Sequence, residues 1–212
     1  MTAQNVLVFG ASGGTGRQVV MQALGHGDHV TAFVRDPARL PLTDERLRVV
    51  TGSVTEDDPA LTAAMQGQDV VISTLGAGKS FASGNVIANS AERIVRTMRA
   101  SGVRRLIMMS AFGVGETDRD VPFIPRMFGR LLLKDVYRDK AAGEAHVHRS
   151  DLAWTVVYPT ALFDGPETGH VRSGERLALS GFPRIARADV AAFMLEQVGD
   201  TRYVRKGVLI SG

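Results

Sequence analysis

The stretch GASGGTGR at residues 10–17 decides the fold of this chain. It follows a short apolar run, Asn5 to Phe9, and it opens the segment Gly14 to Leu24, in which apolar residues recur at helical spacing. Its glycines permit a tight strand-to-helix turn and allow a pyrophosphate to approach the backbone closely. The helix that follows would direct free N–H groups and its positive dipole end at the same place. The stretch therefore predicts a nucleotide-binding βα unit.

The same stretch also satisfies the pattern G-x-S-x-G, through Gly10, Ser12 and Gly14. That pattern is the nucleophile turn of α/β-hydrolases. A hydrolase of this kind also needs an oxyanion-hole donor from an earlier strand–helix loop, and the nine residues before Gly10 are too few to form one. We therefore expect Ser12 to hydrogen-bond a phosphate.

Strand-like and helix-like segments alternate along the rest of the chain. Continuous apolar runs such as Val70 to Ile72 and Leu106 to Met109 are typical of strands buried on both faces, and their alternation with helices indicates a parallel sheet between two helical layers. We predict one Rossmann-type α/β domain over residues 1–212, doubly wound with helices on both faces, and a small substrate-side region at about 111–134 and 160–185. The expected strands are 5–9, 29–34, 48–51, 69–74, 105–110, 153–158 and 208–210, and the expected helices are 14–24, 59–65, 85–101, 135–149 and 189–198.

The composition excludes several classes of protein. The 212 residues are 44% hydrophobic and 22% charged, which is ordinary for a globular chain. The sequence holds no cysteine, so disulfides, thiolate metal sites and cysteine nucleophiles are excluded. The net charge of +3 is spread along the chain, so we expect no nucleic-acid partner. No apolar run is long enough to span a membrane and no signal peptide is evident, so a cytoplasmic location is the simplest expectation.

The end of the second expected strand distinguishes between cofactors. NAD-binding proteins usually place an acidic residue there for the ribose 2′-hydroxyl, whereas an arginine accommodates the 2′-phosphate of NADP. This chain has Arg35 there, and a planar guanidinium suits a phosphate. Asp36 follows, but Pro37 after it favours a capping role for Asp36. We expect NADP(H) in preference to NAD(H).

Four segments together resemble a known family. GASGGTGR at 10–17, VRDPARL at 34–40, GQDVVI at 67–72 and SAF at 110–112 occur in the order seen in atypical short-chain dehydrogenases/reductases with NAD(P)H-binding, NmrA-like domains. The resemblance is to the branch that includes biliverdin-IXβ reductase/flavin reductase, and it covers essentially the whole chain. The stretch 159–169 again follows the flavin-reductase pattern, with Asp164, Pro166, Thr168 and Gly169.

The resemblance implies a cofactor site assembled after successive strands. The residues implied to hold the pyrophosphate are Gly10, Ser12, Gly13, Gly14, Thr15 and Gly16. Arg35 would hold the 2′-phosphate. Ser53 and Val54 would flank the adenine, although the family usually has aspartate where this chain has Ser53.

The nicotinamide side is implied to come from three later strands. Thr74, Leu75 and Gly76 would line the ribose and nicotinamide, and Ser110 would face the nicotinamide ring. The residues implied to cover the ring are Tyr158, Pro159 and Thr160.

The catalytic residues depart from the usual pattern. Typical short-chain dehydrogenases use Tyr-x-x-x-Lys, in which the tyrosine donates a proton. Here Tyr137 and Lys140 are only three residues apart, so they share a helix face in a different register. Glu144 follows Lys140 by four residues, which is either a feature kept by atypical relatives or an ion pair on the surface. Ser110 is the better candidate for orienting a carbonyl or a flavin ring. The candidate catalytic residues are Ser110, Tyr137 and Lys140.

Two further features leave alternatives or exclude a site. The apolar segment from Phe112 to Leu133, broken by glycines and prolines, either forms a substrate lid or packs against the core or a dimer partner. His146 and His148 are two residues apart on an expected helix, so their side chains diverge and we expect no metal site.

The sequence leaves hypotheses from three classes. The first is an NADPH-dependent reductase that passes hydride to a flat aromatic or carbonyl acceptor, such as a flavin or quinone, with a small molecule as its partner and a monomeric or homodimeric state. The second is a non-catalytic NADP(H)-binding redox sensor of the NmrA type that acts through a protein partner. Nucleotide-sugar isomerase or epimerase chemistry ranks last, because it normally needs the intact tyrosine pair.

Overall fold

The computed structural model describes residues 3–56, 58–76, 85–115, 117 and 134–212. An eight-stranded sheet has the order β3-β2-β1-β4-β5-β6-β10-β8, and a separate pair is formed by β7 and β9. Adjacent strands of the large sheet run parallel except at its edge, where β8 is antiparallel to β10. The strands are β1 (Asn5–Phe9), β2 (His29–Val34), β3 (Leu47–Thr51), β4 (Val70–Ser73), β5 (Arg105–Met109), β6 (Ala153–Pro159), β7 (Ala161–Phe163), β8 (Arg172–Gly174), β9 (Arg184–Ala186) and β10 (Lys206–Ser211).

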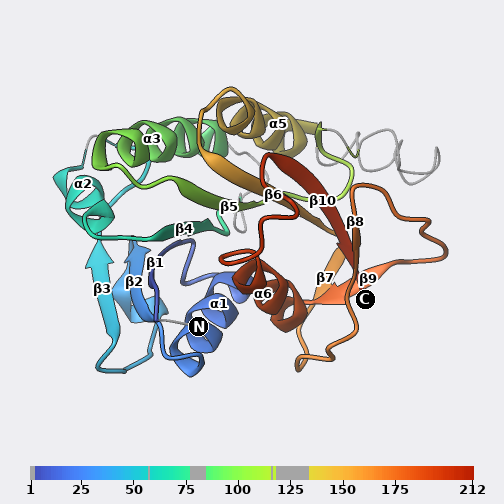
Figure 1. The fold of residues 1–212 in the computed structure, drawn as a ribbon, viewed down its shortest axis with the longest axis horizontal. Coiled ribbons are helices and arrows are strands. Elements are labelled where there is room, and N and C mark those ends of the chain that lie inside the picture. Colours follow the sequence, from blue (N-terminus) through green and yellow to red (C-terminus); the bar gives the residue numbers. More distant parts are fainter. Residues whose placement is uncertain (1–2, 57, 77–84, 116, 118–133) are drawn as a thin grey trace.

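Helices cover both faces of the sheet, as Figure 1 shows. One face carries α1 and α6, which pack side by side, and the opposite face carries α2, α3 and α5. This is the doubly wound arrangement that the sequence predicts. The helices are α1 (Gly14–Gly25), α2 (Pro59–Met65), α3 (Val86–Ser101), α5 (Lys134–His148) and α6 (Arg187–Glu196), with a short 3₁₀ turn, η1 (Pro37–Arg39).

The core consists of two apolar layers, one on each face of the sheet. Because successive strand residues point to opposite faces, Val6 and Val8 of β1 join the layer beneath α1 and α6, whereas Leu7 and Phe9 join the layer beneath α2, α3 and α5. All four side chains are buried. The central strands are thus apolar on both faces, and for this reason they read as continuous hydrophobic runs in the sequence.

The predicted helices are present, and their ends lie within two residues of the predicted ones; the largest difference is α6, predicted at 189–198 and observed at Arg187–Glu196. Asp58 caps α2, since its carboxylate accepts from the Ala60 N–H at 2.8 Å. Gly102 ends α3 with a φ of 76°, the left-handed conformation that favours glycine. Asp36 accepts from the Ala38 N–H at 3.0 Å and so caps η1, which is the capping role that the sequence predicts for Asp36.

The backbone N–H groups at the start of α3 find their hydrogen-bond acceptors on another helix. Asp139 of α5 is buried, and its two carboxylate oxygens accept from the N–H groups of Ile87 (3.0 Å) and Ala88 (2.9 Å). These are orphan donors of the first turn of α3, so Asp139 acts as a cap supplied by the tertiary structure. The bond fixes α5 against α3 above the sheet.

The sheet order reverses beside β1. The chain runs from β1 outward to β2 and β3, and then crosses back to place β4 on the other side of β1. Ligands of doubly wound sheets bind beyond the carboxyl ends of the strands at such a point. Within the described residues, no helix has the length and apolar character needed to cross a membrane.

Candidate active site

The glycine-rich turn after β1 has no room for side chains at two of its positions. Gly10 has a φ of +77°, and its carbonyl oxygen accepts from the N–H of Gly13 at 2.9 Å. A Cβ placed on Gly16 would overlap the Gly10 carbonyl oxygen and lie 2.6 Å from the hydroxyl of Thr74. At the N-terminus of α1 the backbone is therefore tightly wound and is not covered by side chains at Gly10 and Gly16. This arrangement forms a cradle that fits a pyrophosphate.

Thr74, directly after β4, connects the ends of two strands. Its hydroxyl donates to the carbonyl oxygens of Phe9 (3.1 Å) and Gly10 (3.3 Å). A Cβ on Gly10 would lie 2.8 Å from that same hydroxyl. The structure thus brings Thr74, predicted for the ribose side, into contact with the glycine turn.

The ends of β2 and β3 carry the residues predicted for the adenosine half. Arg35 is exposed. Arg17 donates to the backbone oxygen of Arg39 at 3.0 Å, which ties η1 to the first turn of α1. The Ser53 hydroxyl shares a hydrogen bond of 3.0 Å with Thr55. Val54 is buried in the apolar layer that contains Leu61 and Phe33.

A buried hydrogen-bonded cluster lies where β5 and β6 end. The Ser110 hydroxyl donates to Oε1 of Glu144, and the Tyr158 hydroxyl donates to Oε2 of the same carboxylate at 3.0 Å. Ser110 and Glu144 are each 2% exposed and Tyr158 is 1% exposed. One carboxylate therefore orients two hydroxyl groups that come from different strands.

The surface ion pair considered for Lys140 and Glu144 is wrong, because both side chains are buried. They lie on the face of α5 that packs towards the sheet, together with Val147. The signal was present in the sequence, since residues 140, 144 and 147 have the spacing of one helical face. What the sequence did not indicate is that Glu144 would join Ser110 and Tyr158.

Burial changes the acidity of two candidate catalytic groups. It lowers the pKa of the Lys140 ammonium from 10.5 to about 8, and the nearby carboxylates of Glu144 and Asp139 offset part of that shift. Tyr137 is half-buried, and burial raises the pKa of its hydroxyl. A raised pKa makes Tyr137 a weaker proton donor at neutral pH.

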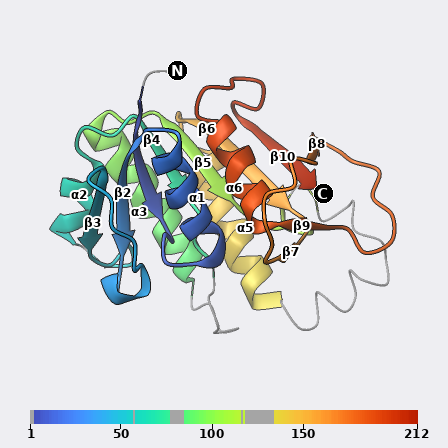
Figure 2. The same ribbon diagram turned by 90° about the horizontal axis from the view of Figure 1, so that it is seen from below.

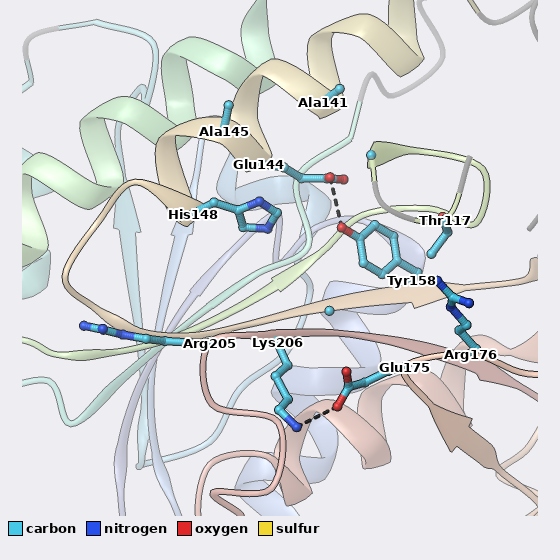
Figure 3. Close-up of a pocket in the computed structure, with 12 residues that line it drawn as sticks. Thr117, Ala141, Glu144, Ala145, His148, Tyr158, Glu175, Arg176, Arg205 and Lys206 are labelled. Carbon is cyan, nitrogen blue, oxygen red and sulfur yellow. Dashed lines mark hydrogen bonds and ion pairs between the residues drawn. The ribbon is translucent and has the colours of Figure 1, made fainter. Parts of the chain in front are cut away.

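A pocket of about 710 Å³ lies beside this cluster, as Figure 3 shows. Glu144 and His148 of α5 and Tyr158 of β6 form one side, and the Glu144–Tyr158 hydrogen bond faces the pocket. Glu175, after β8, pairs with Lys206 at 2.6 Å on the opposite side. This volume lies in the usual range for pockets that bind small molecules.

Other predicted residues have defined places or lie outside the described residues. Thr160, after β6, is buried and shares a hydrogen bond of 3.3 Å with Ser211. Of the expected lid or packing segment, residues 116 and 118–133 are outside the described part of the chain. Within the described part, no three His, Cys, Asp or Glu residues gather closely enough to hold a metal ion.

The fold and the glycine cradle agree with the family assignment. The chain belongs to the NAD(P)H-binding family, whose model matches residues 10–201. Among curated proteins it is similar to oxidoreductase stcQ of Emericella nidulans, with 27% identity over 96% of this chain and 81% of that protein. The family resemblance drawn from the sequence is therefore confirmed.

Two solved structures share the fold of this chain. The anaerobillin reductase ChuY of Escherichia coli O157:H7 matches with a TM-score of 0.82 and 22% identity, over 97% of this chain and 96% of that one. A short-chain dehydrogenase/reductase of Veillonella parvula in complex with NADP matches with a TM-score of 0.83 and 19% identity, over 100% and 95% of the two chains. At these identities the matches establish the Rossmann-type fold.

Proposed function

We propose that the protein is an NADPH-dependent reductase that transfers hydride to a flat aromatic or carbonyl acceptor, such as a flavin or quinone. The observation that carries this proposal is the buried Ser110–Glu144–Tyr158 cluster. It lies at the carboxyl ends of β5 and β6 and borders a pocket large enough for such an acceptor. The reductases among the relatives and structural neighbours support the same chemistry.

The cofactor would lie across the carboxyl ends of the central strands. The proposed pyrophosphate ligands are the backbone and side chains of the glycine turn: Gly10, Ser12, Gly13, Gly14, Thr15 and Gly16. Thr74, Leu75 and Gly76 would line its ribose and nicotinamide side, with Pro159 and Thr160 across from them. Bound in this way, NADPH would supply the hydride.

The preference for NADPH is proposed from the charge after β2. The exposed guanidinium of Arg35 would pair with the 2′-phosphate, and Arg17, which contacts η1, would add positive charge to the same end of the site. One oxygen of the Asp36 carboxylate accepts the capping bond from Ala38, which ties this acid to η1.

The chain's own part in the reaction would be to orient the acceptor and stabilise its charge. Ser110 and Tyr158 each donate their single hydroxyl proton to Glu144, so their oxygens would accept hydrogen bonds from N–H or O–H groups of the acceptor. The ammonium of Lys140, one helical turn from Glu144, would add positive charge at neutral pH, below its pKa of about 8. The raised pKa of Tyr137 favours solvent over Tyr137 as the proton source.

The proposal is tested by titrating the purified protein with NADPH and NADH, and then following the loss of NADPH absorbance with FMN, riboflavin and a set of quinones. We expect tighter binding of NADPH and turnover of at least one acceptor. Glu144→Gln should lower that turnover about tenfold, because it removes the charged acceptor that orients both hydroxyls. Glu196→Gln, an exposed change on α6, is the control and should have no effect.

Two results would contradict the proposal. Tight NADPH binding with no turnover of any acceptor would favour the redox-sensor function, in which this chain binds the nucleotide and acts through a protein partner. Failure to bind either nucleotide would refute both the reductase and the redox-sensor hypotheses.

A further inference from the structure

We propose that Arg187, the first residue of α6, is a ligand of the cofactor's pyrophosphate. This inference rests on the proposed position of the pyrophosphate at the glycine turn. Arg187 is far from that turn in the sequence, and none of the motifs that predict the cofactor site includes it. Three features of the structure carry the inference: a steric contact, a fixed orientation and an excess of positive charge.

The steric contact is with the glycine turn itself. A Cβ built on Gly14 would lie 2.7 Å from Cδ of Arg187 and 2.8 Å from its Nε. The arginine side chain therefore crosses the first residue of α1 in the space that a side chain at position 14 would occupy. Glycine at this position accommodates Arg187, and the guanidinium is thereby placed beside the bare backbone of the cradle.

The orientation of Arg187 is set by Asp164. A guanidinium N–H donates to the Asp164 carboxylate at 2.9 Å. The Arg187 side chain is 28% exposed and that of Asp164 is 89% exposed, so the pair contributes little to stability. Its effect is to direct the guanidinium, which has five N–H donors and so retains others for a phosphate.

The segment that carries Asp164 is itself anchored to α6. The buried carboxylate of Asp189 accepts from the N–H of Thr168 (2.7 Å), the hydroxyl of Thr168 (2.8 Å) and the N–H of Gly169 (3.0 Å). These bonds hold the turn after β7 against the first turn of α6. Asp164 and Arg187 directly follow Phe163 and Ala186, which are paired between the parallel strands β7 and β9, so the two side chains extend from the same end of one unit.

That unit is also fixed relative to α1. Figure 1 and Figure 2 both show α1 and α6 side by side, and their apolar faces share one core layer. Gln22 of α1 donates to the backbone oxygen of Ala188 at 3.0 Å. The distance between Arg187 and the glycine turn is therefore set by packed helices.

The charge arrangement calls for an anion. The first turn of α1 contains no acidic residue and already presents the positive end of the helix dipole. Arg187 adds a second positive charge at the same place, and Asp164, being exposed, screens it only weakly. The exposed Asp164 supplies one negative charge at the edge, and a pyrophosphate over the turn would balance the rest.

Binding measurements test this inference without relying on turnover. The variants are Arg187→Met, Arg187→Lys and Asp164→Asn, with the exposed Arg202→Met as a control for loss of one positive charge. Each is titrated with NADPH, with ADP-ribose, which has the pyrophosphate but no 2′-phosphate, and with adenosine 2′-monophosphate, which has no pyrophosphate. Thermal unfolding of each variant verifies that it is folded.

We expect Arg187→Met to weaken NADPH and ADP-ribose about tenfold or more, because a charged hydrogen bond to phosphate is lost. Adenosine 2′-monophosphate should bind as to the unmodified protein, and Arg187→Lys should weaken the two pyrophosphate ligands less than Arg187→Met. Asp164→Asn should change the affinity for neither ligand by more than about threefold, since the amide oxygen of asparagine can still accept the hydrogen bond that orients Arg187.

The inference is overturned if Arg187→Met binds ADP-ribose as tightly as the unmodified protein. It is also overturned if Asp164→Asn and Arg187→Met weaken binding equally, because Arg187 would then act only by holding the turn after β7. If the unmodified protein binds neither NADPH nor ADP-ribose, the proposed function itself is refuted and this inference falls with it.

Discussion

Replacing Gly16 with alanine tests whether the glycine turn is as tightly wound as the structure indicates. The added methyl group would overlap the carbonyl oxygen of Gly10 and approach its carbonyl carbon to 2.7 Å and the Thr74 hydroxyl to 2.6 Å. None of these atoms can move away easily. Two belong to the backbone, and the Thr74 hydroxyl is held by the carbonyl oxygens of Phe9 and Gly10.

The expected cost follows from overpacking of a buried site. Inserting a methyl group where no space exists costs about 1–3 kcal/mol. For a chain of this size, each kcal/mol lowers the unfolding temperature by about 2–4 °C, so Gly16→Ala should unfold about 2–12 °C below the unmodified protein. Because relief of the clash requires α1 to move away from the turn after β1, NADPH binding should weaken as well.

The matched control is Gly25→Ala on the same helix. A Cβ on Gly25 meets no atom within 4 Å, and alanine is the better helix former, so this variant should be as stable as the unmodified protein or more stable by at most about 1 kcal/mol. Calorimetry and NADPH fluorescence titration measure both variants. If Gly16→Ala unfolds at the same temperature as Gly25→Ala and binds NADPH normally, the tight turn is refuted.

Three further predictions concern charged groups. Arg35→Ala should weaken NADPH binding about tenfold and leave NADH binding nearly unchanged in paired titrations, and equal losses would contradict the role of Arg35. Asp139→Ala should lower the free energy of unfolding by about 1–3 kcal/mol, because the N–H groups of Ile87 and Ala88 lose their acceptor, and an unchanged urea midpoint would count against this. Lys140 has a folded-state pKa of about 8, below its ordinary 10.5, so its destabilising effect is complete below pH 8 and is relieved as the pH rises towards 10.5. The free energy of unfolding should therefore rise over that interval relative to Lys140→Met, and parallel pH profiles of the two proteins would refute it.

The large sheet could be predicted from the sequence because its signals are local. Apolar runs such as Val70 to Ile72 are buried on both faces, and helix ends such as Gly102 carry their own conformational preference. The small strands were missed for the same reason. β8 is only Arg172–Gly174 and β9 only Arg184–Ala186, and segments this short show no periodicity. They form because neighbouring strands offer them partners.

In the candidate site, too, local sequence signals could be predicted and contacts between distant elements could not. The glycine turn was predicted from sequence alone, since a turn of this kind needs particular residues at fixed spacing, whereas the role of Arg35 stays a prediction. The roles of Asp139 and Glu144 were not, although the helical spacing of residues 140, 144 and 147 could have indicated a buried face. Whether a buried carboxylate meets N–H groups or hydroxyls depends on which elements pack above it.

The sequence by itself therefore determined the nucleotide-binding βα unit and the order of strands and helices that follows it. Backbone conformation depends mainly on neighbouring residues, so glycine spacing and hydrophobic period are sufficient evidence for it. Only the tertiary structure decided that Ser110, Glu144 and Tyr158 share hydrogen bonds, and that Arg187 lies on Gly14. Those contacts join residues from separate elements, and their meeting depends on how α5 and α6 pack against the sheet and α1.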